Sequence, residues 1–123
     1  MIAAGVHHIS FAVKDLERSR AFYKDLLGLT RIPRPDFGIP GYWLRAGNTE
    51  VHLIATPPGL DTGRGPDKLS PLANHQAFAI TDYAAARDAF CAHGIEVMEM
   101  APDRGQFWVR DPDANILEFI VQR

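Results

Sequence analysis

The stretch that decides the fold occurs twice, as HHISFAVKDLERSRAFYKDLLGL at residues 7–29 and as NHQAFAITDYAAARDAFCAHGI at residues 74–95. The matched pairs are His8 and His75, Phe11 and Phe78, Ala12 and Ala79, Asp15 and Asp82, Arg20 and Arg87, and, one position out of step, Gly28 and Gly94. A second pair of segments follows in the same order, YWLRAGNTEVHLI (42–54) and FWVRDPDANILEFI (107–120). In this pair Trp43 falls on Trp108, Arg45 on Arg110 and, after one extra loop residue, His52 falls opposite Glu118. Both pairs of matched segments occur in the same order along the chain, which indicates that a unit of roughly sixty residues is duplicated.

Each copy has the order strand, helix and three further strands. The predicted first strands are Val6–Val13 and Gln76–Ile80. Asp15 and Asp82 are placed to cap the helices, because a carboxylate accepts hydrogen bonds from the free amides of a first turn. Gly28 and Gly94 stand where a helix ends in a left-handed residue. The last two strands of each copy form a hairpin, since AGNT and DPDAN are rich in turn-forming residues.

We therefore predict an α+β fold in which two βαβββ modules form a cupped mixed sheet with the helices on its outer face. The chain of 123 residues fits one domain. Module 1 covers about residues 1–56 and module 2 about residues 74–123. The Pro- and Gly-rich residues 57–73 lack periodicity and are predicted to be a linker or a mobile flap.

The bulk composition excludes several classes of partner. A net charge of −2 argues against nucleic acid and against an anionic membrane surface. The single cysteine, Cys91, cannot form an internal disulfide, and the N-terminus lacks the basic and apolar regions of a signal peptide. No apolar run reaches membrane-spanning length. We expect a cytoplasmic protein with a small-molecule partner.

The repeat places one residue able to bind a metal on the first strand of each copy and one on the last. The set is His8, His52, His75 and Glu118. Alternation along a strand puts small or aliphatic residues on the same face, namely Ser10, Ala12, Ile54, Ala77, Ala79 and Ile120. The opposite face, toward the helices, carries Ile9, Phe11, Val13, Val51, Leu53, Leu117 and Phe119. Three imidazoles and one carboxylate suit one divalent ion per site: Zn, Ni, Co, Mn or Fe(II).

Other residues of the right chemistry are assigned more ordinary roles. His7 is expected to be structural and His93, in AHG, to lie at the surface or cap a helix. The candidate walls of a substrate pocket are Phe37, Trp43, Phe107 and Trp108. Core packing is the alternative for all four, and it is favoured for the two tryptophans. Arg104 is a candidate for an anionic substrate group or, alternatively, a solvated arginine.

The two quoted motifs resemble the vicinal oxygen chelate superfamily over nearly the whole chain. HHISFAVKDLERSRAFYKDLLGL looks like its first strand and helix, and RDPDANILEF like its closing hairpin. The superfamily includes glyoxalase I, extradiol dioxygenases, methylmalonyl-CoA epimerase, and fosfomycin and bleomycin resistance proteins. The resemblance implies metal ligands at His8, His52, His75 and Glu118. It also implies paired modules in a homodimer, with each site built within one chain or across two.

The resemblance favours a metal-dependent, glyoxalase-like lyase or isomerase. The metal would bind two neighbouring oxygens of a small substrate and stabilise an enediolate, with Glu118 as the base. Glutathione is not the expected cosubstrate, because Ala12 and Thr56 replace an arginine and an asparagine of glyoxalase I. The alternatives are an extradiol-type iron dioxygenase and a non-catalytic small-molecule binding or resistance protein.

Overall fold

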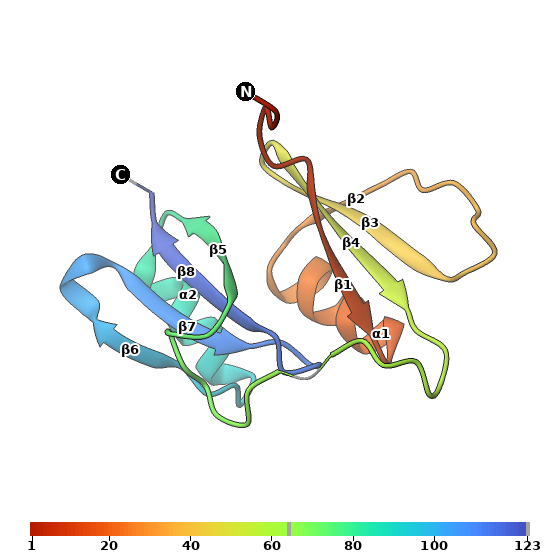
Figure 1. The fold of residues 1–123 in the computed structure, drawn as a ribbon. Helices are drawn as coiled ribbons and strands as arrows, with labels where there is room; N and C mark the ends of the chain where they lie inside the picture. The colour runs from red at the N-terminus through yellow and green to blue at the C-terminus, as the bar shows by residue number, and fades with distance from the viewer. Residues whose placement is uncertain (64, 123) are drawn as a thin grey trace. The chain divides into compact units, whose positions relative to one another are not determined.

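The computed structural model describes residues 1–63 and 65–122, and the chain divides into two compact units, Met1–Gly63 and Arg64–Arg123 (Figure 1). Arg64, inside the predicted linker, and Arg123, at the end of predicted module 2, lie outside the described residues. In the described part of the chain, no helix is long and apolar enough to cross a membrane.

The first unit is a four-stranded sheet with one helical segment on one face (Figure 1). Its elements are β1 (His8–Val13), α1 (Leu16–Arg20), the π-helical segment η1 (Ala21–Leu26), β2 (Thr30–Ile32), β3 (Gly41–Ala46) and β4 (Thr49–Ala55). The strand order is β1-β4-β3-β2, in which β1 runs parallel to β4 and the other pairs are antiparallel. The crossover from β1 to β4 therefore puts β4 in the interior of the sheet.

The second unit repeats this topology. Its elements are β5 (His75–Ile80), α2 (Tyr83–Ala92), β6 (Met98–Ala101), the 3-10 turn η2 (Pro102–Arg104), β7 (Gln106–Arg110) and β8 (Ile116–Val121). The order β5-β8-β7-β6 has β5 parallel to β8, so β8 takes the interior place that β4 has in the first unit. The predicted α+β class and the two βαβββ modules are confirmed. The joining of both sheets into one cup stays a prediction.

The predicted helix boundaries are also confirmed. Asp15 accepts a hydrogen bond from the amide of Arg18, and Asp82 accepts one from the amide of Ala85, each at 3.0 Å. Gly28 and Gly94 have φ angles of 78° and 71°, which only glycine adopts without strain. The first helix differs from the second in its π-helical second half.

The π-helical segment explains the one-residue offset between the repeats. Thirteen positions separate Asp15 from Gly28, whereas twelve separate Asp82 from Gly94. A π turn takes up one extra residue, because its hydrogen bonds span five residues and not four. The amide of Leu27 donates such a bond to the carbonyl of Phe22 at 2.9 Å. The longer first helix therefore begins with the same cap and ends with the same glycine as the second.

Alternation along the strands separates a buried face from an open one in each sheet. In the first unit Phe11, Val13, Leu44, Val51 and Leu53 are buried, and the ring of Phe11 stacks on Tyr23 of η1 at 5.1 Å between centroids. In the second unit the buried residues are Phe107, Val109, Leu117 and Phe119 of the sheet with Phe90 of α2. The other face of each sheet carries the small residues predicted for it.

The second half of the predicted linker packs against the second unit. Leu69 is buried and contacts Trp108 and Ile116. A guanidinium nitrogen of Arg110 donates to the backbone carbonyl of Asp67 at 3.1 Å. The segment is thus held to the second sheet at Leu69 and Asp67.

The turn between β7 and β8 contains a strained residue. Ala114 has a φ of 67°, which costs an L-residue about 1–2 kcal/mol. Asp111 holds this turn by accepting bonds from the amides of Asp113 and Asn115 at 2.9 and 2.8 Å. The turn therefore keeps Ala114 in a conformation that glycine would adopt freely.

We predict that Ala114→Gly stabilises the protein. Relief of the strain should exceed the greater entropy of glycine in the unfolded chain, and the free energy of unfolding should rise by about 0.5–1 kcal/mol. The control is Ala21→Gly, because Ala21 is helical with a φ of −59° and is not strained. This change should lower the free energy of unfolding by about 1 kcal/mol. Chemical denaturation measures both. A destabilised Ala114→Gly protein would contradict this account of the turn.

Candidate metal centre

The first unit brings two of the predicted ligands together on its open face. Ser10 of β1 lies opposite His52 of β4, so His8 and His52 share one face. Their rings stack, with centroids 4.0 Å apart and planes at 15°. The ring of Trp43 stacks on the other side of His52, at 4.3 Å and 8°. Three neighbouring strands therefore carry a column of three parallel rings.

Both imidazoles of this column have a partner for one nitrogen. Nε2 of His52 lies 3.0 Å from Oε1 of Glu50, and Nδ1 of His8 lies 2.8 Å from Nδ1 of His7. The hydrogen bond with His52 lowers the pKa of Glu50, and the charge of Arg45 adds to this effect while partial desolvation opposes it. Glu50 is thus held as a carboxylate beside His52. His7 is exposed, and its role as a structural residue is consistent with its contact to His8.

The second unit brings the other two predicted ligands together. Nε2 of His75, on β5, lies 3.7 Å from Oε1 of Glu118, on β8. Nδ1 of His75 lies 2.7 Å from the carbonyl of Ala73, which only accepts, so this nitrogen carries a proton. In the neutral ring the lone pair is then on Nε2, which faces Glu118. Glu118 is 9% exposed and accepts a bond from Nε2 of Gln106 at 3.4 Å.

The His75 and Glu118 pair has the chemistry of a cation site. An imidazole lone pair and a carboxylate oxygen both accept, so a positive species suits the space between them. Two ligands about 2.1 Å from one tetrahedral ion lie about 3.4 Å apart, close to the separation of these two atoms. Within residues 1–63 and 65–122, no three His, Cys, Asp or Glu side chains come together to hold a metal ion. Each unit supplies two of the four predicted ligands.

The candidate pocket residues of the first unit lie beside its histidines. Trp43 is half-buried against His52, and the ring of Phe37 is 6.0 Å from that of Trp43. Phe37 is 58% exposed. Core packing, which the sequence favoured for Trp43, therefore describes only part of its surroundings, since one of its faces covers a predicted ligand.

The candidate pocket residues of the second unit have other positions. Phe107 is fully buried between Phe90 and Phe119, so it belongs to the core and not to a pocket wall. Arg104 is exposed in η2. Trp108 packs with Leu69 as a core residue, as the sequence analysis favoured.

Two polar neighbours of the ligands were missed from the sequence. Glu50 lies two residues before His52 on the same strand, and alternation along β4 could have identified it. Gln106 reaches Glu118 from β7, and only the pairing of β7 with β8 shows this. His93 was assigned correctly, since its Nδ1 lies 2.8 Å from the carbonyl of Ala89 at the end of α2.

The contact to Ala73 predicts the tautomer of His75. In the neutral ring without metal, Nδ1 should carry the proton and Nε2 should not. Two-bond ¹H–¹⁵N correlation spectra distinguish the tautomers, and His75→Gln assigns the signal. A proton on Nε2 with a bare Nδ1 would contradict the proposed orientation of this ring.

Comparisons with known proteins agree with the fold. Residues 5–119 match the model of the Glyoxalase/Bleomycin resistance protein/Dioxygenase superfamily. The chain is 25% identical over 121 residues to "Glyoxylase I 4" of Arabidopsis thaliana, covering 92% of this chain and 68% of that protein. A stretch of 52 residues is 38% identical to the mitochondrial methylmalonyl-CoA epimerase of Bos taurus and spans only 30% of its length.

Solved structures show the same architecture. A glyoxalase family protein from Bacillus anthracis superposes with a TM-score of 0.78 at 26% identity, over 100% of this chain and 98% of that one. The family match covers most of the chain, and the structural likeness covers all of it. The chain belongs to the Glyoxalase/Bleomycin resistance protein/Dioxygenase superfamily.

Proposed function

We propose that this protein is a divalent-metal-dependent lyase or isomerase of the glyoxalase type, acting on a small oxygenated substrate. The observation that carries the proposal is the pair formed by His75 and Glu118, two acceptors 3.7 Å apart on the open face of a sheet. The first unit offers His8 and His52 at equivalent positions. The two pairs would hold one ion, either within one chain or across a homodimer.

The family relationship supports this class of activity without fixing the substrate. The chain matches a protein named for glyoxalase I over most of its length, and part of it matches an epimerase. These relatives favour a lyase or isomerase over a dioxygenase. The class of substrate and the use of a divalent metal come from the proposal and not from these relatives.

The residues around Glu118 suit it to move a proton. A bound divalent ion would supply a Lewis acid to oxygens of the substrate. Glu118 would accept a proton from carbon and return it to the neighbouring atom. Gln106 would hold the carboxylate through its amide. Ala77 and Ala79, which are exposed beside His75, leave room for a small molecule.

The two histidines of the first unit must rearrange to bind one ion. Stacked rings direct their in-plane lone pairs along parallel planes, so one imidazole has to turn before both can bind the same atom. Turning His52 would separate it from Glu50 and from the ring of Trp43. Metal binding should therefore change the environment of Trp43.

The metal prediction is tested on protein purified without a histidine tag and stripped with a chelator. Reconstitution should give close to one divalent ion per chain, because each chain supplies all four of the proposed ligands. Combining His75→Ala with Glu118→Ala should weaken metal binding by at least about 100-fold. Losing a residue that only hydrogen-bonds to a metal ligand already lowers metal affinity by about 10–100-fold, and these two residues are proposed to bind the ion directly. His93→Ala is the control and should retain the metal. Loss of stoichiometric binding in the unaltered protein would overturn the proposal.

The fluorescence of Trp43 provides a second test of the same site. Addition of Zn²⁺ to the stripped Trp108→Phe protein, in which Trp43 is the remaining tryptophan, should change the emission in step with binding. His52→Ala should abolish this change. An unchanged emission in the metal-bound protein would show that His52 does not turn away from Trp43 when the metal binds.

The role of Glu118 is tested by turnover. Hemithioacetals and other α-oxygenated carbonyl compounds are screened for solvent deuterium incorporation, with catechols and oxygen uptake as the test of a dioxygenase. Glu118→Gln should lower kcat by about 10²–10⁴-fold. Glu96→Gln, an exposed change in the same unit, should leave kcat unaltered. Oxygen uptake with catechols and no proton exchange would contradict the proposed class.

A further inference from the structure

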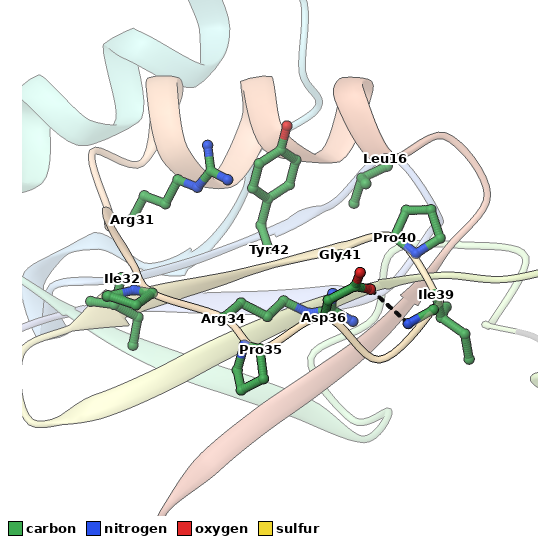
Figure 2. A pocket seen from close by; sticks show the side chains of 12 residues that line it. Leu16, Arg31, Ile32, Arg34, Pro35, Asp36, Ile39, Pro40, Gly41 and Tyr42 are labelled. Atoms are coloured by element: carbon green, nitrogen blue, oxygen red, sulfur yellow. Dashed lines mark hydrogen bonds between the residues drawn. The ribbon is translucent and has the colours of Figure 1, made fainter.

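A hollow of about 890 Å³ opens in the first unit where β2 and β3 separate (Figure 2). Ile32 and Trp43 form the last pair of these strands, and the chain then leaves the sheet at Pro33 and returns at Gly41. The residues that matter for its chemistry are Leu16, Arg31, Arg34, Asp36, Gly41 and Tyr42. The hollow therefore lies within one unit and is bounded mainly by one loop.

Arg34 is the distinctive residue of this hollow. Its Nε is buried and has no hydrogen-bond partner. Its Cζ lies 5.1 Å from the centre of the Phe37 ring. The guanidinium also lies directly over Gly41, where a Cβ would come within 2.9 Å of Cζ and Nε. In the part of the chain that the structure describes, Arg34 forms no ion pair.

The two arginines that line the hollow have different neighbours. The Cζ of Arg31 lies 4.7 Å from the centre of the Tyr42 ring, so this second guanidinium also rests on an aromatic face. Asp36 is the one acidic residue among those lining the hollow, and its Oδ1 accepts a bond from the amide of Gly38 at 2.8 Å. Tyr42 also donates its hydroxyl to Glu17 of α1 at 2.7 Å, so Arg31 has a second carboxylate near it on the helix side of the strand.

A partly buried guanidinium without an anion is unfavourable, because it has lost water without gaining a partner. Its planar fork of donors matches the oxygens of carboxylate and phosphate groups, and stacking on a ring holds it in position. We propose that this hollow binds an oxyanion, a carboxylate or a phosphate group, with Arg34 as the anchor.

The position of Arg34 connects this site to the metal centre. Figure 2 shows Tyr42 pointing toward helix α1 and Arg34 running along the other side of β3. Phe37 contacts both Arg34 and Trp43, and Trp43 covers His52. Gly41, under the guanidinium, is roughly 7 Å along the strand from Trp43. The link between this site and the substrate rests on the proposed function. If that function holds, the substrate is a small oxygenated acid whose anionic group reaches Arg34.

The site is tested by NMR on metal-free protein, which separates it from the metal prediction. Inorganic phosphate and, in a second arm, acetate are titrated while the ¹H–¹⁵N signals of Arg34 Nε and of the Gly38 and Gly41 amides are followed. We expect saturable shifts in at least one arm, and that arm identifies the anion. Arg34→Gln should weaken binding at least about tenfold, because a hydrogen bond to a charged group is lost. Arg34→Lys should fall between the two, since it keeps the charge but loses the fork.

Arg18→Gln is the matched control, because it removes one exposed positive charge from the same unit outside the hollow. It should bind the anion as the unaltered protein does. Shifts that do not saturate in either arm, or that persist unchanged in folded Arg34→Gln protein, would overturn the anion site while leaving metal binding untouched. Once turnover is found, Arg34→Gln should raise KM for acidic substrates and not for neutral analogues. An equal rise for both would overturn the link to the substrate.

Discussion

The packing of one helix against one sheet face is the constraint on which each unit depends. A strand alternates its side chains between two faces, so burying Phe11, Val13, Val51 and Leu53 under the first helix leaves His8 and His52 on the open face. A slip of one residue would exchange the two sets and bury both imidazoles in the core. The same packing that stabilises the unit therefore also presents the predicted ligands.

The duplicated units use their open faces differently. In the first, Trp43 stacks on a histidine and Phe37 is exposed beside it, so an aromatic surface stays accessible. In the second, the equivalent Trp108 is covered by Leu69 from the segment between the modules. The second unit keeps the more polar pair, His75 with Glu118.

Much of the fold could be predicted from the sequence because the signals are local. An aspartate cap, a closing glycine and the hairpin turn residues each act within a few positions, and the repeat reinforced every one of them. The π-helical turn was visible only as the one-residue offset between Gly28 and Gly94. Its hydrogen bond from Leu27 to Phe22 gives that offset a physical cause.

The surroundings of the candidate site were harder to predict because they depend on pairings between distant segments. The contact of Gln106 with Glu118 requires the register of two strands, and the position of Arg34 requires a loop without regular structure. Phe107 was misassigned to a pocket because alternation alone did not show which face of β7 lies under α2. Its partner ring, Phe90, comes from that helix.

The central claim is that the two modules share one ion through three imidazoles and one carboxylate. X-ray absorption spectroscopy of the zinc-reconstituted protein tests this most directly, because multiple scattering counts the imidazole ligands. The account predicts a signal for three histidines, reduced to two in His8→Ala protein. A signal for one histidine or none, unchanged in that variant, would contradict it.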